Sequence, residues 1–551
     1  MDAPQDKRDE RSKSIDAISN TEKTTDLTMN KQDEATGLEL GTFDSNPSAD
    51  VLPGGRLPGS NDDVRFATTR KELWSYYTYY VGNNGLGPFN FGPSQFQNLL
   101  SLAGWSASDP SQPCNSSEPC MLGPFAGQVR DINSIVLLCN GISFAIQAGM
   151  FLLIGSFADY GSWRPWITIS FTVLAWGISF GWLGVETPDK WQTGAVLYIL
   201  GLIAYQGALT FWTAAFPQLA RDLPEMMESE KQLLAGEKDM QEHETLDVMS
   251  RNRISNMSFV VCNAGEVIIL AIMVGILKAV NSDAGVEQNT KAFSILIAFS
   301  AACWIICAIP WFVLEKHRPG KALPAGSNYF TVACKNVWYA LKECLKLKQT
   351  FLYLIFYFLM GDTLNTTVTV VGTLQNSIVS YSTLQLTLLL IVGIFASAVG
   401  SYVFWIIQKK FKINTKTMLL VNVVFILLLD GWGFLGIWLD NFGFKNVWEV
   451  WVYQAFYGFF VCPWYSYSQT MISEVVPKGK EFLFFALFSI IGKTSSFIGP
   501  FVSSAIIDRS GNDNMPFAFL LGLGILSSFL LIMVDVKKSR KECKEYLEKE
   551  T

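Results

Sequence analysis

Residues 474–507 read EVVPKGKEFLFFALFSIIGKTSSFIGPFVSSAII, and this stretch decides the fold. A charged turn from Pro477 to Glu481 precedes an apolar run that is long enough to cross a bilayer. One cation, Lys493, interrupts the run. If the helix begins near Phe482, Lys493 lies about 16–17 Å along it at ~1.5 Å per residue, close to the centre of a ~30 Å hydrocarbon layer. The stretch therefore predicts a membrane protein with a charge at mid-bilayer depth.

Lys493 is the leading candidate for a functional residue in this sequence. An ammonium group at that depth costs roughly 2.5–3.5 kcal/mol or more unless it faces a partner or water. We therefore expect Lys493 either to pair with an acid or to bind a carboxylate of a transported solute. Two structural alternatives stay open, namely an ion pair that only holds helices together and a lysine whose stem snorkels to an interface.

The composition of the whole chain supports a membrane protein. Half of the 551 residues are hydrophobic and only 16% are charged, whereas soluble domains carry about 25% charged residues. The formal net charge of −6 says little, and no strongly basic domain occurs, so nucleic acid is not an expected partner. The first residues, MDAPQDKRDERSKSIDAISN, lack the apolar core of a signal peptide, so insertion is expected to start from the first membrane helix.

The apolar runs predict an all-α membrane protein with about twelve transmembrane helices. We expect a disordered cytosolic tail at 1–72, a six-helix half at 73–314, a central cytosolic loop at 315–350, a second six-helix half at 351–535 and a cytosolic tail at 536–551. Two pseudo-symmetric halves joined by a cytosolic loop are the arrangement of major facilitator transporters. The runs lie at about 74–102, 132–157, 165–184, 193–216, 253–278, 291–314, 351–376, 382–408, 416–438, 447–470, 482–507 and 514–534.

Two segments depart from a simple apolar helix. The first run, 74–102, carries several glycines and prolines, and such breaks are tolerated at membrane depth only where they face protein or a water-filled cavity. Breaks of this kind build binding sites in transporters, and close packing of small residues is the alternative. The acidic segment 218–252 has Leu and Met at roughly helical spacing and favours a surface helix, an interfacial helix or a disordered loop.

The charges of the loops indicate the orientation. Lysine and arginine are concentrated in the loops assigned to the cytosol, which places both termini there. The loop after the first run, assigned to the other side, holds Cys114 and Cys120 and an N-x-S glycosylation sequence at Asn115. A candidate disulfide and a glycosylation site both suit an oxidising, glycosylating compartment, so the two observations agree.

The loop after the second run reads GSFADYGSWRPW and is a candidate gating element. Gly155, Asp159, Gly161 and Arg164 approximate the major facilitator pattern G-x-x-x-D-x-x-G. The aspartate can cap the next helix and pair across a cytosolic gate, while the glycines permit a tight turn. The alternative is a simple connection between two helices.

Three acids interrupt the apolar runs: Glu266, Asp362 and Asp430. Each lies about 17–21 Å deep at ~1.5 Å per residue, which is level with Lys493. Acids at this depth should be neutral or paired, and they are often functional. We expect at least one to relay a proton. Asp362 is the best candidate because the seventh helix normally lines the cavity, Glu266 is the next, and packing is the expected role of Asp430.

The remaining polar residues in the runs are weaker candidates. Asn140, Gln147 and Gln206 could hydrogen-bond a zwitterionic substrate, although bonding between helices explains them equally well. No catalytic constellation, Walker A sequence or clustered His/Cys spacing occurs. We therefore expect neither an enzyme nor an ATP-driven pump, and no catalytic residue, metal or cofactor.

Three stretches carry a resemblance to a known family: KELWSYYTYYVGN at 71–83, GSFADYG at 155–161 and VPKGKEFLFFALFSIIGKTSSFIGP at 476–500. With these, residues 68–535 resemble the autophagy-related vacuole effluxer family, a branch of the major facilitator superfamily. The resemblance implies release of amino acids, including branched-chain and aromatic ones, from the fungal vacuole to the cytosol after autophagic breakdown.

These observations together favour a secondary transporter that works by alternating access, with its cavity between the two halves. We expect a monomer in the vacuole membrane whose partners are the lipid bilayer, small molecules such as amino acids, and protons. One alternative is a proton-coupled exporter of another small organic metabolite in the plasma membrane. A membrane sensor or scaffold without transport is the other, and the many buried polar residues argue against it.

Overall fold

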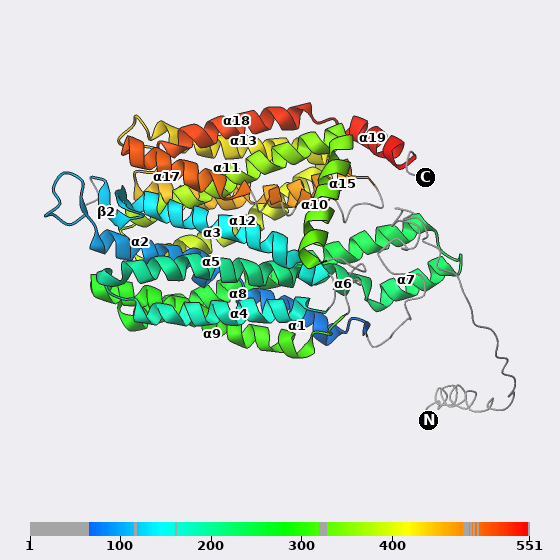
Figure 1. The fold of residues 1–551 in the computed structure, drawn as a ribbon, viewed down its shortest axis with the longest axis horizontal. Coiled ribbons are helices and arrows are strands. Elements are labelled where there is room, and N and C mark those ends of the chain that lie inside the picture. Colours follow the sequence, from blue (N-terminus) through cyan, green and yellow to red (C-terminus); the bar gives the residue numbers. More distant parts are fainter. Residues whose placement is uncertain are drawn as a thin grey trace, which may run out of the picture. The chain divides into compact units, whose positions relative to one another are not determined.

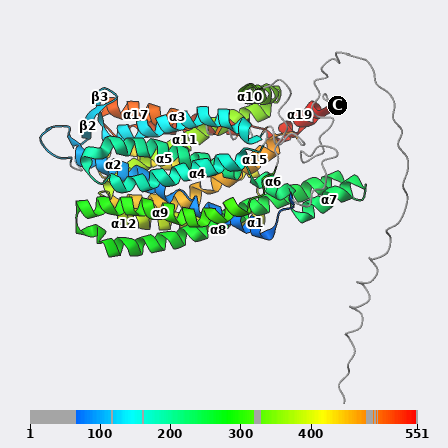
Figure 2. The same cartoon turned by 60° about the horizontal axis from the view of Figure 1, so that its bottom comes forward.

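Long helices run side by side between two ends of the bundle (Figures 1 and 2). One end carries a small sheet and is called the sheet end; the other, where the last helix α19 (Val536–Glu548) lies, is called the tail end. This computed structural model describes residues 66–114, 118–159, 162–318, 328–477, 484, 487–488, 491–492 and 495–548. All of them belong to one compact unit, Pro53–Thr551.

The first half of the bundle contains α1 to α9. The helices are α1 (Arg70–Gly82), π-helical η2 (Leu86–Phe91), α2 (Gly92–Ala103), α3 (Ile132–Asp159), α4 (Arg164–Gly181), α5 (Trp191–Thr213), α6 (Phe216–Arg221), α7 (Pro224–Leu234), α8 (Met240–Val280) and α9 (Val286–Leu314). Short 3₁₀ turns connect some of them: η3 (Trp182–Gly184), η4 (Pro188–Lys190) and η5 (Ser282–Ala284).

Helix α10 (Tyr329–Lys346) lies in the connection between the halves. The second half contains α11 (Lys348–Ile378), α12 (Thr383–Phe411), α13 (Thr415–Leu435), α14 (Val447–Phe456), π-helical η6 (Tyr457–Val461), α15 (Pro463–Val475), α17 (Ile498–Ser510) and α18 (Pro516–Met533).

Nine helices of the described part are long and apolar enough to cross a membrane. The other predicted runs occur in interrupted form: 74–102 is divided into α1, η2 and α2, and 447–470 into α14, η6 and α15. The run 482–507 ends in α17 and lies partly outside the described residues. The helical architecture therefore agrees with the sequence, while twelve crossings stay a prediction.

The break in the first run is packed against protein. Gly85 has a φ of 89°, and a Cβ there would lie 2.7 Å from the Tyr205 hydroxyl of α5. Just before it, a Cβ on Gly82 would lie 2.7 Å from the Cα of Trp304 in α9. Only glycine fits such close approaches, so the contacts at this break are those of small residues packing closely.

The break in the tenth run was not predicted from the sequence. A Cβ on Gly458 of η6 would lie 2.5 Å from the carbonyl oxygen of Gly393 in α12, and a Cβ on Gly400 would lie 2.3 Å from the carbonyl oxygen of Phe459. Pro463 then opens α15 at a position where a missing N–H is tolerated. The wide turn of η6 thus lies where two helix backbones nearly touch.

The acidic segment 218–252 is helical, as one of the sequence alternatives expected. It forms the end of α6, all of α7 and the beginning of α8, at the tail end (Figure 2). Helix α7 packs on α8, where the Ser229 hydroxyl lies 3.0 Å from Nδ1 of His243 and Arg253 pairs with Glu225.

A three-stranded antiparallel sheet marks the sheet end. Its order is β1 (Trp105–Ser106), β2 (Cys120–Phe125) and β3 (Gln128–Asp131), with Trp105 opposite Met121 and Met121 opposite Asp131. Strand β3 leads directly into α3, so the sheet fixes where the second long helix begins.

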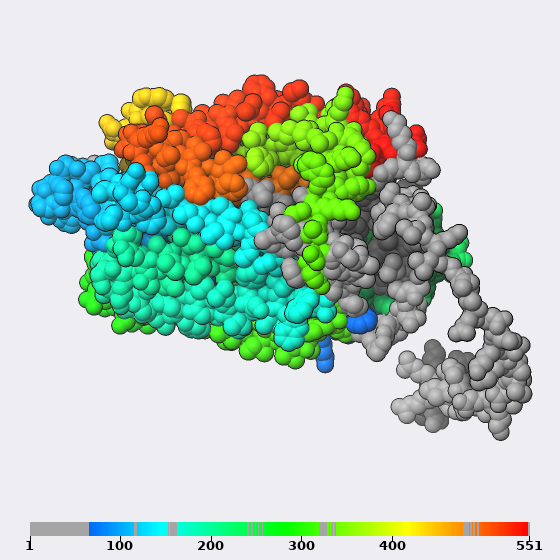
Figure 3. All heavy atoms as spheres, in the orientation of Figure 1, coloured from blue at the N-terminus to red at the C-terminus, as the bar shows by residue number. Residues whose placement is uncertain are grey.

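The two halves share an apolar core near the sheet end. This core joins side chains of α2, α5 and α9 in the first half to Val379, Leu386, Leu389 and Val450 in the second half. Helix α3 also packs along α17, and Figure 3 shows the cyan surface of α3 directly beneath the orange surface of α17. The halves are therefore in close contact at this end of the bundle.

Candidate functional site

Asp362 lies in the middle of α11 and contacts the beginning of α17. The residue is 2% exposed, and its Oδ1 accepts a hydrogen bond of 3.0 Å from the backbone N–H of Gly499. The first N–H groups of a helix have no partner within the helix and carry a partial positive charge. Asp362 therefore supplies to α17, from another helix, the acceptor that a capping residue would supply from its own chain.

Close packing holds this contact in place. A Cβ on Gly499 would lie 1.9 Å from Oγ1 of Thr366 and 3.0 Å from Oδ1 of Asp362, so only glycine fits between α11 and α17. Thr366 itself is fully buried. The sequence GKTSSFIGP thus contains a glycine whose role is to bring the backbone of α17 against a carboxyl group.

Lys493, the leading candidate from the sequence, lies outside the described residues. Its described neighbours in the chain run along α11. A Cβ on Gly492 would lie 2.8 Å from the ring of Tyr357, and the Ser496 hydroxyl accepts a 2.9 Å hydrogen bond from Asn365. The described residues on either side of Lys493 in the chain, Gly492 and Ser496, therefore both contact α11.

The other two membrane acids lie in different surroundings. Asp430 of α13 is fully buried and accepts a 2.6 Å hydrogen bond from the Thr367 hydroxyl of α11. This contact is one of packing between helices within the second half. Glu266 of α8 is partly buried beside Cys262, whose thiol lies 3.4 Å from the carbonyl oxygen of Tyr80. Glu266 makes no hydrogen bond or ion pair with any residue that the structure describes.

The polar candidates of the first half bond mainly within that half. The Asn140 amide donates to the Tyr198 hydroxyl at 3.1 Å and so joins α3 to α5. The Gln147 amide donates to the Ser143 hydroxyl one turn earlier in α3, at 2.9 Å. Gln206 of α5 is half-buried. The structure does not gather these three side chains around Asp362.

The predicted gating loop is described only in part. Gly155 and Asp159 end α3, their side-chain surroundings are not described, and Gly161 lies outside the described residues. Arg164 begins α4, and its guanidinium lies 2.9 Å from Oε1 of Glu315, just after α9. Both side chains are buried, so this ion pair connects two helices of the same half.

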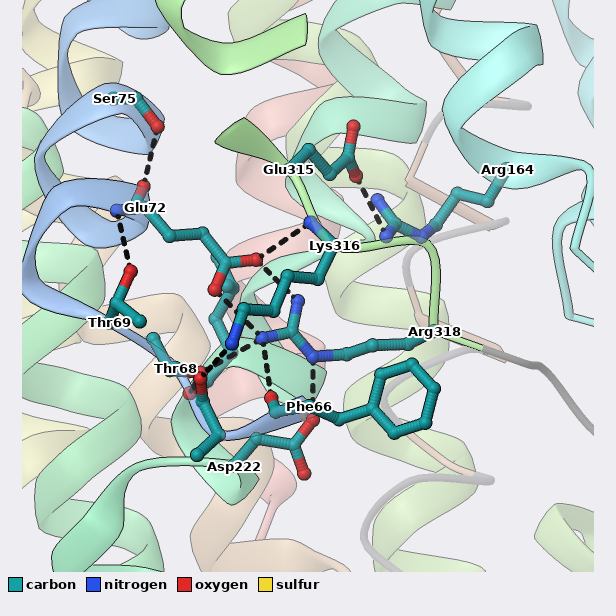
Figure 4. Close-up of polar contacts among 12 residues, drawn as sticks. Phe66, Thr68, Thr69, Glu72, Ser75, Arg164, Asp222, Glu315, Lys316 and Arg318 are labelled. Atoms are coloured by element: carbon teal, nitrogen blue, oxygen red, sulfur yellow. Dashed lines mark hydrogen bonds and ion pairs between the residues drawn. The ribbon is translucent and has the colours of Figure 1, made fainter. Parts of the chain in front are cut away.

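A second buried cation, Arg318, lies at the same end of the first half (Figure 4). Its Nη1 donates to Oε1 of Glu72 at 2.6 Å and its Nε donates to Oδ2 of Asp222 at 2.6 Å. Its Nη2 also donates to the carbonyl oxygen of Phe66 at 3.0 Å and to the Thr68 hydroxyl at 3.2 Å. One guanidinium thus joins the chain before α1, α1 itself, the end of α6 and the chain after α9. We call Glu72, Asp222 and Arg318 the tail-end cluster.

Opposite charges in these contacts partly compensate one another. Burial lowers the pKa of Arg318, but the hydrogen bond and charge of Glu72 and the charge of Asp222 outweigh burial and leave this pKa raised. Burial raises the pKa of Glu315, and the neighbouring Arg164 offsets only part of this. Breaking such a buried pair on one side is strongly destabilising because the remaining charge has no compensation.

Polar contacts also join the two halves at the sheet end. The Gln97 amide donates to the Thr373 carbonyl oxygen at 2.9 Å, and the Asn376 amide donates to Oε1 of Gln97 at 2.8 Å. The Ser134 and Ser504 hydroxyls lie 2.8 Å apart, between α3 and α17. Each of these bonds joins a residue of the first half to a residue of the second half, so the bonds can exist only while the two halves are in contact at the sheet end.

The loop at the sheet end contains a disulfide between Cys114 and Cys120. It closes the chain between β1 and β2, next to Gly104, where a Cβ would lie 2.7 Å from the Cys120 sulfur. Asn115, the predicted glycosylation residue, lies outside the described residues.

Sequence reasoning missed the tail-end cluster and the joint at the sheet end. Glu72 lies inside the quoted motif KELW, and Arg318 follows a predicted span, yet they are 246 positions apart in the chain. The sequence did contain a signal: an acid, Glu72, lies just before the first span, and a base, Arg318, lies just after the sixth. Charged residues in such positions need partners if they are buried.

Known proteins are similar in sequence to this chain over most of its length. The family described as "Vacuole effluxer Atg22 like" matches residues 68–544. The chain belongs to this vacuole effluxer family. Autophagy-related protein 22 of Chaetomium globosum is 25% identical, with 88% of this chain and 82% of that protein covered. Autophagy-related protein 22 of Yarrowia lipolytica is 24% identical, with 78% and 80% covered. The resemblance seen in the sequence is confirmed.

Solved structures of transporters share the fold. The inward-open xylose transporter XylE from E. coli has a TM-score of 0.51 at 11% identity, covering 84% of this chain and 95% of that chain. A mutant of the nucleoside transporter NupG has a TM-score of 0.50 at 12% identity, covering 86% and 100%. The vacuole effluxer described here is thus a transporter with the major facilitator fold, and not an enzyme.

Proposed function

We propose that this vacuole effluxer carries amino acids, released by autophagic breakdown, out of the vacuole into the cytosol by alternating access. The family match over residues 68–544 is the observation that carries the proposal. The two-halved bundle supports it, since secondary transporters of this fold move the halves against each other around a central site. The many buried polar groups of α11 and α17 fit a polar solute.

The proposed site lies between α11 and the segment that precedes α17. An amino acid carries a carboxylate and an ammonium group, so it needs both a positive and a negative partner. Lys493 is proposed to receive the carboxylate, and Asp362 or Glu266 to carry a proton. The hydrogen bond from Gly499 to Asp362 suggests how proton binding and substrate binding could be linked. A protonated Asp362 would be a weaker acceptor, so the N-terminus of α17 would become available to the substrate carboxylate.

In the proposed orientation the tail end faces the cytosol and the sheet end faces the vacuole lumen. The excess of lysine and arginine in the loops assigned to the cytosol supports this. The disulfide of Cys114 and Cys120 at the sheet end supports it too, because disulfides form outside the reducing cytosol. Glycosidase treatment tests it, since a mobility shift that is lost in Asn115→Gln would place this loop in the lumen.

The decisive experiment locates the tagged protein and measures efflux of labelled amino acids from isolated vacuoles that contain or lack it. We expect faster efflux of branched-chain and aromatic amino acids with the protein, and no such gain with Lys493→Gln. Equal efflux from both kinds of vacuole would contradict the proposed cargo. Residence in the plasma membrane would favour export of another metabolite.

A further inference from the structure

Two carboxyl groups meet at the joint between the halves. Asp131 is the last residue of β3 and precedes α3 in the first half. Asp513 lies in the turn between α17 and α18 of the second half. Neither residue belongs to the candidate transport site around Asp362, and no motif of the sequence pointed to them.

A single residue, Asn133, holds both carboxyl groups. Its backbone N–H donates to Oδ1 of Asp131 at 2.7 Å, and its side-chain Nδ2 donates to Oδ2 of Asp513 at 2.7 Å. The two acids are therefore separated by the dimensions of one residue. Asn133 is an uncharged donor to both, so it positions the carboxyl groups without neutralising them.

The charged groups around the pair leave it short of positive charge. Arg130 is engaged by Asp508, itself an acid of the second half. Lys445, an exposed residue before α14, is the cation whose charge reaches Asp513. Burial and, more weakly, the charges of both acids raise the pKa of the Tyr381 hydroxyl, in the turn between α11 and α12.

Burial makes two adjacent negative charges unfavourable here. Asp131 is 5% exposed. Burial raises the pKa of Asp131 well above its usual range, and the charges of Asp513 and, more weakly, Asp508 raise it further. Burial also raises the pKa of Asp513, which the bond from Asn133 and the charge of Lys445 partly offset. Two acids so placed titrate as a pair and share a proton readily.

We propose that Asp131 and Asp513 form a proton-sensitive latch that keeps the two halves together at the sheet end while the pair holds a proton. The latch exists only in the closed joint, because its acids come from opposite halves. Once the halves separate, both carboxyl groups meet water and return to their ordinary acidity. Protons therefore bind more tightly to the closed joint, and by linkage protons favour closure.

The direction of the effect follows from the sign of this linkage. Carboxyl groups that hold their proton more tightly in the closed joint stabilise it at low pH, and this contribution is lost as the pH rises through their pKa in the closed joint. Each pKa unit of difference between the closed and open joint changes the closed-to-open ratio by up to about tenfold. In the proposed orientation the joint faces the acidic side of the membrane, where protons favour its closed state. The inference goes beyond the proposed function and does not depend on which solute is carried.

Hydrogen–deuterium exchange of the full-length protein in lipid nanodiscs tests the latch. Exchange is compared at about pH 5 and about pH 8, with labelling times corrected for the intrinsic effect of pH. The informative peptides cover 128–137 and 500–515, and peptides of α13 serve as an internal reference. For the wild-type protein we expect slower exchange in the informative peptides at the lower pH, by up to about tenfold per pKa unit.

Asp513→Asn and Asp131→Asn keep an acceptor for Asn133 but remove one charge. We expect a smaller pH difference in each single variant, since one buried carboxyl group remains, and no difference in the double variant, where exchange should be slow at both pH values. Asp440→Asn is the matched control, because Asp440 is an exposed acid of the same end, and it should keep the wild-type difference. Equal exchange of the wild-type protein at both pH values, or an undiminished difference in Asp513→Asn, would overturn the latch. Loss of amino-acid efflux together with an intact pH difference would instead contradict only the proposed cargo.

Discussion

Asp362 and Gly499 join α11 to α17 through one hydrogen bond of 3.0 Å between a carboxylate and a backbone N–H. Asp362 therefore has two properties that can be tested separately: its oxygen accepts this hydrogen bond, and its carboxyl group can bind and release a proton. An acceptor at a helix N-terminus is worth about 0.5–2 kcal/mol. The charge matters for structure only in strengthening that bond.

Substitutions at Asp362 separate these properties. We expect Asp362→Asn to fold, because its amide oxygen can accept the same bond, but to lose proton-dependent transport. Asp362→Ala should lose transport and also about 0.5–2 kcal/mol of stability. Thermal unfolding and proton-dependent uptake in reconstituted vesicles measure the two effects. Unchanged proton-dependent uptake by Asp362→Asn would contradict a proton-relay role.

Gly499→Ala should be destabilising through a clash with one identified side chain. The added Cβ would lie 1.9 Å from Oγ1 of Thr366, and overpacking of this kind costs about 1–3 kcal/mol. Thr366→Ala removes that oxygen, so the double variant should regain part of the loss, as a double-mutant cycle of thermal unfolding would show. Gly522→Ala is the control, because a Cβ there meets open space. An equal loss in the double variant would place the strain elsewhere.

The positions of the helices were predictable because lipid imposes a simple rule. Every backbone group within the hydrocarbon layer must be bonded inside the chain, so apolar runs become helices almost without exception. The run 416–438 is thus α13 (Thr415–Leu435), and 132–157 is α3 (Ile132–Asp159). The break at η6 was not predictable, because the glycines that cause it, Gly393 and Gly458, lie far apart in the sequence.

Partners of charged residues were harder to predict than the residues themselves. Arg164 was expected to act in a gate, and the structure pairs it with Glu315 of the same half. The loop charges of the sequence indicate only that a base such as Arg318 lies on the cytosolic side, whereas the structure makes Arg318 the centre of a buried cluster. A sequence shows that a charge exists beside a span, whereas burial and partner depend on which helices become neighbours.

Arg318→Met should be strongly destabilising. It leaves Glu72 and Asp222 without their shared cation, and breaking a buried pair on one side costs about 3–5 kcal/mol. Arg318→Lys should recover only part of this, because an ammonium cannot donate to both acids with the geometry of a guanidinium. Thermal unfolding in detergent measures the loss. Arg253→Met is the control, since its pair with Glu225 is exposed and worth about 0–1 kcal/mol.

Arg164→Gln should become more destabilising as the pH rises. Burial raises the pKa of Glu315, and Arg164 is the charge that makes its ionised form tolerable. Without Arg164, the folded protein favours a protonated Glu315, so stability is present at low pH and falls as the pH rises through the raised pKa. We expect a larger loss of thermal stability at about pH 8 than at about pH 5.

A second substitution checks this explanation of the pH dependence. The double variant Arg164→Gln, Glu315→Gln has no carboxyl group at the site, so its stability relative to the wild-type protein should vary much less with pH. A loss in Arg164→Gln that is the same at both pH values would mean that Glu315 is not the titrating group.

Closing the sheet end permanently should stop transport. The Ser134 and Ser504 hydroxyls lie 2.8 Å apart on opposite halves, so cysteines at both positions can form a disulfide across the joint. Under oxidising conditions we expect Ser134→Cys, Ser504→Cys to show background transport, and a reductant to restore it. The two single variants and the wild-type protein with reductant are the controls, because the protein has a disulfide of its own between Cys114 and Cys120. Full transport by the oxidised, cross-linked protein would exclude separation of α3 from α17 as a step of the transport cycle.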